Sequence, residues 1–139
     1  LIEADVALAA AVGAHGVHVH SVQAATAARD TLGAQTIIGV SARAALETAL
    51  AAVAAGADYV SFGACFASPT LPEARPIDLS VLERSAALGV PRVAIGGISP
   101  DNAGTLVARG VDYVASISAL FGAADIEAQA RRFSQLFPH

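Results

Sequence analysis

The sequence predicts an α/β fold built on a parallel sheet, and three observations support this class. Five times along the chain an Ala-rich helical stretch ends in glycine and is followed by a short β-branched run. The runs are almost wholly apolar, which is typical of strands covered on both faces. Successive units lie about 20 residues apart, with one spacing near 33. Units this short that alternate helix with buried strand are βα repeats of a parallel sheet.

A glycine marks the junction in each unit, because glycine favours the left-handed conformation that ends a helix. These glycines are Gly13, Gly33, Gly56, Gly89 and Gly110. The strands that follow them are predicted at residues 16–20, 36–40, 59–63, 93–96 and 113–117. A final amphipathic helix is predicted at residues 125–136.

The long spacing contains a loop and not a helix. Residues 64–77 include Pro69, Pro72 and Pro76, and three prolines exclude a regular helix or a central strand. Loops that follow parallel strands carry the chemistry of such folds, so we expect functional residues in this segment. Asp78, just after it, is the predicted N-cap of the next helix.

Composition and charge narrow the class of function. The 139 residues are 55% hydrophobic and 14% charged, which predicts one globular domain, residues 1–139. The net charge of −4 and the scatter of the basic residues exclude a nucleic-acid surface. No apolar stretch reaches the roughly 20 residues of a membrane span. The single cysteine, Cys65, is expected to be an inert thiol and fits a cytoplasmic protein.

Two glycines and a serine turn point to a phosphate site. Gly96 and Gly97 follow a predicted strand and precede a helix start at Ser99. Because Gly97 has no Cβ, its backbone can approach an anion, and the N–H groups of the next turn would bind it. One unit later, Ser118 begins another short turn. Phosphate sites of (β/α)8 barrels are built in this way, which favours a TIM barrel, with about five βα units present, over an open doubly wound sheet. The alternative is that the glycines only make a tight turn.

Six strings, in this order and at these spacings, resemble the thiamine phosphate synthase family, which also includes a thiazole tautomerase. They are GVHVH at 16–20, IGVS at 38–41, GADYVSFG at 56–63, FASPT at 66–70, AIGGISPDN at 94–102 and SISALF at 116–121. The resemblance covers nearly the whole chain, from the fourth barrel strand to the last helix. It implies an N-terminally incomplete barrel domain. Five of eight strands would leave two open edges. Upstream residues, which we favour, or a second chain would cover them, or the piece would be poorly stable alone.

The resemblance implies a transferase of thiamine biosynthesis. The family's synthase uses Mg²⁺ and joins a pyrimidine pyrophosphate to a thiazole phosphate. A carbon–oxygen bond breaks, the thiazole nitrogen attacks the pyrimidine cation, and pyrophosphate leaves. Carried over by motif, Ser41 contacts the pyrophosphate, while Ser68 and Thr70 meet the thiazole and pyrophosphate groups. Backbone N–H groups that hold the thiazole phosphate are implied at Gly96, Gly97, Ile117 and Ser118. The expected partners are therefore small-molecule phosphates.

Three positions depart from the family pattern. Leu71 stands where the synthase has a lysine after the loop threonine, and Gln23 stands where it has an Mg²⁺-binding aspartate. Ala64 stands where the tautomerase has a histidine. Mg²⁺ is thus expected for the family, but no metal ligand is evident in this chain, since an amide poorly replaces a carboxylate. Two alternatives to the synthase stay open. One is a non-catalytic or divergent phosphate-binding relative, such as an accessory domain of a fusion or a tautomerase-like protein. The other is a different phosphate-binding barrel enzyme, such as an isomerase or an aldolase-like protein.

Two pairs of polar residues also have structural interpretations. His18 and His20 point to one face of a strand. They could form a metal pair, but we favour two hydrogen-bonded imidazoles. Asp58 and Asp112 recur at the same place in two units, which favours a turn or cap role over paired catalytic carboxylates.

Overall fold

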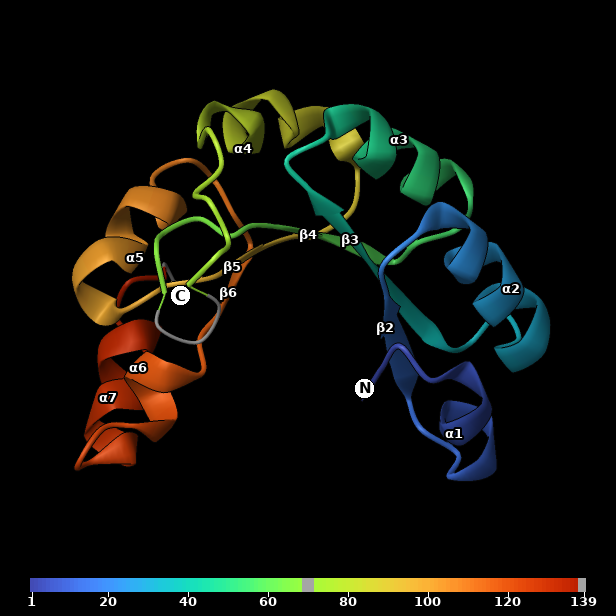
Figure 1. Ribbon diagram of the computed structural model, residues 1–139, viewed down its shortest axis with the longest axis horizontal. Helices are drawn as coiled ribbons and strands as arrows, with labels where there is room; N and C mark the ends of the chain where they lie inside the picture. The colour runs from blue at the N-terminus through green and yellow to red at the C-terminus, as the bar shows by residue number, and fades with distance from the viewer. Residues whose placement is uncertain (69–71, 138–139) are drawn as a thin grey trace.

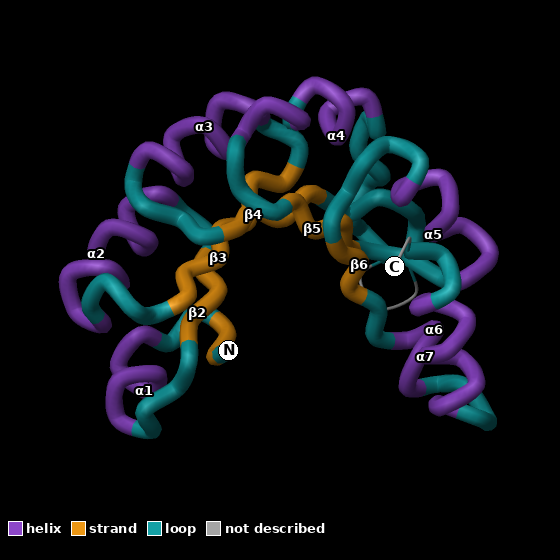
Figure 2. Tube along the Cα trace, turned by 180° about the vertical axis from the view of Figure 1, so that it is seen from behind, coloured by secondary structure: helices purple, strands orange, loops and turns teal. Residues whose placement is uncertain are grey.

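The sheet is a curled half-ring with the helices on its outer side (Figure 1). The computed structural model describes residues 1–68 and 72–137. Within these residues, six strands pair in chain order, each parallel to the next. They are β1 (Ile2–Glu3), β2 (Gly16–Val19), β3 (Ile37–Arg43), β4 (Tyr59–Phe62), β5 (Arg92–Ile95) and β6 (Tyr113–Ala115). Figure 2 shows the strands along the inner curve. The predicted α/β class with a parallel sheet is confirmed.

The prediction of five βα units was one strand short. β1 pairs with β2, with Ile2 opposite Val17 and Glu3 opposite His18. A two-residue strand with one charged side chain offers no periodicity that a sequence pattern can detect. The described residues therefore form an open half-barrel of six strands, with β1 and β6 at its edges.

The helices lie on the convex side of the sheet (Figure 1). They are α1 (Val6–Ala11), α2 (Val22–Leu32), α3 (Leu46–Ala54), α4 (Ser80–Arg84), the 3-10 helix η1 (Ala86–Leu88), α5 (Pro100–Val107), α6 (Ser118–Phe121) and α7 (Ile126–Ser134). Asp125 caps α7 by accepting the N–H of Ala128 at 2.8 Å. The prediction that Asp78 is the N-cap of α4 was wrong by one residue: the N-cap of α4 is Leu79, and Asp78 precedes it and accepts the N–H of Ser80 at 3.0 Å. No helix of the described residues is long and apolar enough to cross a membrane.

The core lies between the sheet and the helices. Strand residues that point outward are buried, and they meet small residues on the helix faces. The strand residues are Val17, Val19, Ile38, Val40, Val60, Phe62 and Ala94, and the helix residues include Ala25, Ala28, Ala49, Ala52 and Ala103. Alanine has a short side chain, so α2, α3 and α5 can approach the sheet closely. This layer explains the Ala-rich composition and fixes the positions of the strand ends.

Asp58 and Asp112 join neighbouring strands near their amino ends. Asp58 Oδ2 accepts the N–H of Ile38 at 2.7 Å and a guanidinium N–H of Arg29 at 2.7 Å. Asp112 Oδ2 accepts the N–H of Arg92 at 2.8 Å in the same way. The predicted structural role of the two aspartates is confirmed, because each carboxylate closes the start of a strand pair.

The concave face of the sheet carries the other set of strand residues. In closed barrels such positions fill the interior. Here Ile37, Ile95 and Tyr113 on this face are 44%, 41% and 60% exposed. The inner surface of the half-barrel is therefore open and partly apolar.

Candidate anion-binding pocket

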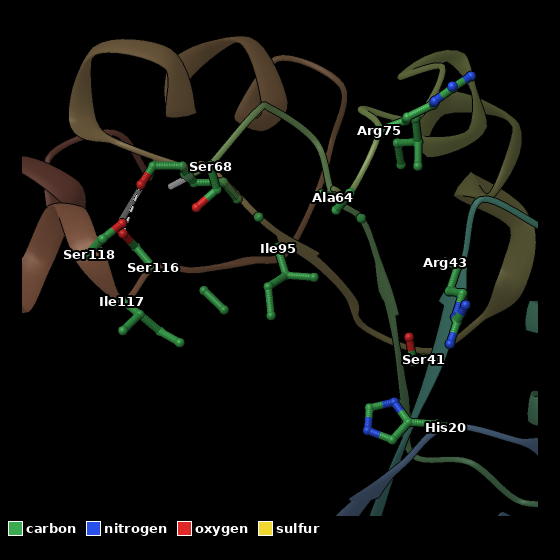
Figure 3. Close-up of a pocket in the computed structure, with 17 residues that line it drawn as sticks. His20, Ser41, Arg43, Ala64, Ser68, Arg75, Ile95, Ser116, Ile117 and Ser118 are labelled. Atoms are coloured by element: carbon green, nitrogen blue, oxygen red, sulfur yellow. Dashed lines mark hydrogen bonds between the residues drawn. The ribbon is translucent and has the colours of Figure 1, made fainter. Parts of the chain in front are cut away.

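A pocket of about 580 Å³ lies at the carboxyl ends of the strands. One side, the serine–glycine end, is lined by Ser68, Gly96, Gly97, Ser116, Ile117 and Ser118. The other side, the arginine end, is lined by His20, Ser41, Arg43 and Arg75. Figure 3 shows His20, Ser41 and Arg43 across the pocket from Ser116, Ile117 and Ser118, and Arg75 farther up, with its side chain directed away from Arg43. Binding sites of parallel α/β folds lie at this edge of the sheet.

The pocket brings together most of the residues predicted from sequence. Ser41, Ser68, Gly96, Gly97, Ile117 and Ser118 all line it. Ser41 comes from β3 and lies across the pocket from Ser116, Ile117 and Ser118. Thr70 and Leu71 lie outside the described residues. The chemical role of each of these residues remains a prediction.

Close contact between two loops requires the glycine pair. Gly96 and Gly97 have φ angles of 98° and 64°, in the region where a side chain is strained. A Cβ on Gly97 would lie 2.4 Å from the carbonyl oxygen of Ala67, and one on Gly96 would lie 2.6 Å from Ala64 Cα. The N–H of Phe66 donates to the Gly96 carbonyl at 3.0 Å. The glycines therefore allow the two loops to pack together, in addition to any role in binding a ligand.

Side chains of α5 and of the β6–α6 turn hold this glycine turn in place. Asn102 donates through Nδ2 to the Gly97 carbonyl at 3.0 Å and accepts the N–H of Ser99 at 2.9 Å. The Ser116 hydroxyl donates to the Ile98 carbonyl at 2.7 Å (Figure 3). Because C=O and N–H point in opposite directions across a trans peptide, the bond to Asn102 directs the N–H of Ile98 away from that side chain.

The β6–α6 turn completes the serine–glycine end. Ile117 is 64% exposed and directly precedes α6. Its carbonyl accepts the N–H groups of Leu120 and Phe121 at 3.2 and 2.8 Å. Ser118 begins α6, so its own N–H has no acceptor within the helix. This end of the pocket can therefore offer backbone N–H groups to an anion.

At the arginine end, Ser41 and His20 were named from the sequence, but Arg43 and Arg75 were not. A bulge interrupts the β3–β4 pairing between Ser41 and Arg43, and Arg43 has a φ of 53°. His20 Nε2 lies 2.6 Å from Glu3 Oε1. Residues two apart on a strand face the same side, so the prediction of Ser41 in the site was the signal that the sequence offered for Arg43. No sequence pattern pointed to Arg75, which reaches the pocket from the long loop.

A hydrogen-bonded network runs along the concave face beside the pocket. His18 Nδ1 lies 2.9 Å from the Tyr59 hydroxyl, and His18 Nε2 lies 3.4 Å from the Ser61 hydroxyl. Burial lowers the pKa of His18, although Glu3 opposes that shift and His20 adds to it. Burial also raises the pKa of Tyr59. The prediction of two hydrogen-bonded imidazoles is confirmed by these bonds and by the His20–Glu3 pair.

The described residues do not fit the Mg²⁺ ion that the resemblance implies. Mg²⁺ prefers oxygen ligands and is usually held by carboxylates. No aspartate or glutamate is among the described residues that line the pocket. Residues 1–68 and 72–137 contain no group of three His, Cys, Asp or Glu side chains that could hold a metal. Gln23 is exposed on α2, outside the pocket lining.

Comparison with known proteins identifies the family. The model of the family described as thiamine monophosphate synthase matches residues 1–120. The chain belongs to the thiamine monophosphate synthase family. It is 50% identical over 138 residues to the thiamine-phosphate synthase of Methylobacillus flagellatus, covering 99% of this chain and 66% of that protein. It is 47% identical to the thiamine-phosphate synthase of Thioalkalivibrio sulfidiphilus, with coverage of 99% and 66%.

Solved structures support the same assignment. A thiamine phosphate pyrophosphorylase from Pyrococcus furiosus superposes with a TM-score of 0.81 at 34% identity, covering 96% of this chain and 64% of that one. A 3-hexulose-6-phosphate synthase superposes with a TM-score of 0.75 at 20% identity, which shows a shared fold alone. The chain thus spans about two thirds of the length of these family members.

Proposed function

We propose that this chain forms the phosphate-binding part of a thiamine-phosphate synthase, a transferase that joins a pyrimidine pyrophosphate to thiazole phosphate. Family membership supports the reaction class. The observation that carries the proposal is the shared pocket of the Gly96–Gly97 turn and the Ser118 turn, at the carboxyl ends of the strands. Two neighbouring turns that offer N–H groups suit a phosphate monoester.

In this proposal each end of the pocket holds one substrate. The thiazole phosphate accepts N–H groups at Gly97, Ile117 and Ser118. Ser68 and Thr70 contact the thiazole ring and the adjacent pyrophosphate, and Ser41 donates to the pyrophosphate from β3. These residues bind and orient the two substrates, so that the thiazole nitrogen faces the carbon from which pyrophosphate leaves.

We further propose that the whole protein is a closed (β/α)8 barrel, formed as one domain. β1 and β6 each pair with a single described strand, and open strand edges invite further pairing. Exposed apolar residues such as Ile37 and Tyr113 on the concave face also suit a barrel interior. We place the protein in the cytoplasm, which suits the buried free thiol of Cys65.

The proposal is tested by assaying the purified full chain for thiamine phosphate and by titrating it with thiazole phosphate in a calorimeter. We expect thiazole phosphate to bind and the product to form when the pyrimidine pyrophosphate is added. A protein that is folded by circular dichroism, yet neither binds thiazole phosphate nor forms product, would refute the proposal.

A further inference from the structure

His20 and Glu3 form a carboxylate–imidazole pair at the edge of the pocket. Glu3 ends β1, His20 directly follows β2, and Glu3 Oε1 lies 2.6 Å from His20 Nε2. His20 lines the pocket, and its side chain is 52% exposed, so it can exchange protons with water. A carboxylate that holds one ring nitrogen orients the imidazole and stabilises its protonated form.

The other ring nitrogen of His20 can face a ligand. Apart from Glu3, no described residue forms a hydrogen bond or an ion pair with the ring. His18, by contrast, uses both of its nitrogens on the hydroxyls of Tyr59 and Ser61. Burial lowers the pKa of His18 from 6.5, so that ring is mostly neutral at pH 7. Of these two histidines, His20 is therefore the one that can donate a proton into the pocket.

The strand register places His20 beside Ser41. Val19 is opposite Val40 across β2 and β3, and His20 and Ser41 are the next residues along the chain. Both line the pocket, and Figure 3 shows the imidazole ring close to the Ser41 hydroxyl. In the proposed function Ser41 contacts the pyrophosphate, which brings the leaving group next to the imidazole.

The charged groups around His20 favour its acid form from one side and oppose it from another. Glu3 faces the ring from β1, His18 lies on the same strand, and Arg43 lines the pocket from β3. Glu3 stabilises an imidazolium, whereas Arg43 disfavours it. On the outer flank of His20 the described neighbours are uncharged: Ala4, Val6, Val19, Ser21, Ala24 and Ala27.

We propose that His20, oriented by Glu3, is a catalytic acid that protonates the leaving group when the carbon–oxygen bond of the pyrimidine pyrophosphate breaks. The electron pair of that bond stays on the pyrophosphate oxygen, which takes the Nδ1 proton of His20. The thiazole nitrogen then attacks the pyrimidine carbon, and His20 regains a proton from water. Glu3 is a positioning residue that holds Nε2. This inference rests on the proposed function for the identity of the substrate.

An imidazolium at this position has a clear chemical use. Negative charge develops on the departing oxygen and must be neutralised, by a metal ion or by a proton. The described pocket lining offers no carboxylate to hold Mg²⁺, and Glu3 beside it is engaged with His20. Because the described donor set does not fit the metal, the proton of His20 supplies the neutralising charge.

The test measures pyrophosphate release from the pyrimidine pyrophosphate alone, in EDTA, where water captures the pyrimidine cation. The full chain should release pyrophosphate at a rate that falls as the pH is raised from about 5 to about 8. His20→Gln should be about 100-fold slower, the lower end of the contribution of a general acid, and should lose this pH dependence. His15→Gln should keep the native rate. His15 is the matched control, since it is an exposed histidine just before β2, outside the described pocket lining.

Two substitutions of Glu3 test its positioning role. Glu3→Ala removes the acceptor of the Nε2 proton and should slow the reaction about tenfold, the effect of about one hydrogen bond. Glu3→Gln keeps an acceptor oxygen and should retain more activity than Glu3→Ala. Both should lower kcat and leave KM unchanged, because Glu3 contacts His20 and not the substrate. A change in KM alone would contradict the positioning role.

Thiamine phosphate formation is assayed in the same variants, with thiazole phosphate added, to separate this inference from the proposed function. Pyrophosphate release that depends on His20, with no thiamine phosphate formed, supports the catalytic acid and refutes the proposed function. Thiamine phosphate formation that needs Mg²⁺, or that His20→Gln sustains at the native rate, supports the proposed function and overturns the catalytic acid. A chain that is folded by circular dichroism and releases no pyrophosphate in EDTA also overturns it.

Discussion

Replacing Asn102 with alanine should weaken both the fold and the phosphate site. The substitution removes the bond from Asn102 Nδ2 to the Gly97 carbonyl, 3.0 Å, and the bond from the Ser99 N–H to Asn102 Oδ1, 2.9 Å. At about 1 kcal/mol net for each hydrogen bond, the free energy of unfolding should fall by about 2 kcal/mol. Urea denaturation measures this change.

The same substitution should reduce thiazole phosphate affinity, because the glycine turn loses the contact that orients its peptide planes. A loss of about fivefold to tenfold is expected, equivalent to about 1 kcal/mol of positioning. Calorimetry on the folded variant measures the change. Gln35→Ala, which removes an exposed amide in the loop before β3, is the control and should change neither quantity.

Asn102→Asp sharpens the prediction. Aspartate keeps an acceptor for the Ser99 N–H and loses the donor to Gly97, so stability should fall less than in Asn102→Ala. Its negative charge suits the first turn of α5 but repels a bound phosphate. Affinity should therefore fall further than in the alanine variant. If Asn102→Ala and Asn102→Asp are both destabilised and yet bind thiazole phosphate with native affinity, the proposed role of the glycine turn in binding is refuted.

Three further predictions concern the frame around the pocket. Because the pKa of His18 is lowered from 6.5 by burial, the unfolded chain takes up the proton first as the pH falls. The free energy of unfolding should be steady above pH 6.5 and decrease below it. His18→Gln should reduce that decrease in urea titrations at pH 8 and pH 5. Asp58→Ala removes the acceptor of the Ile38 and Arg29 N–H groups. Urea denaturation should show that the free energy of unfolding falls by about 1–2 kcal/mol, a modest loss because Asp58 is partly exposed. Burial raises the pKa of Cys65 to about 11, so a disulfide reagent should react at pH 7 only after denaturant is added; rapid reaction of the native protein would contradict this.

Much of the fold could be predicted from the sequence because its strands are buried on both faces. The glycine that ends each helix and the apolar run that follows located β2 to β6 to within a few residues. β1 was missed because two residues do not make a pattern. The end of β3 was missed because the strand continues through a bulge as far as Arg43, and a bulge depends on the neighbouring strand and not on local sequence.

The candidate site was predicted only in part, for a related reason. Gly96, Gly97 and Ser118 belong to local motifs, so sequence strings could identify them. Arg43 and Arg75 lie on different segments, and only the curvature of the sheet and the path of the long loop bring them to one pocket.

The most direct test of the account is a crystal structure of the full chain with thiazole phosphate at saturating concentration. The account predicts the phosphate at the serine–glycine end, with its oxygens about 3 Å from the backbone nitrogens of Gly97 and Ser118. A thiazole phosphate bound instead at the arginine end, or absent from a well-ordered pocket, would contradict the central claim.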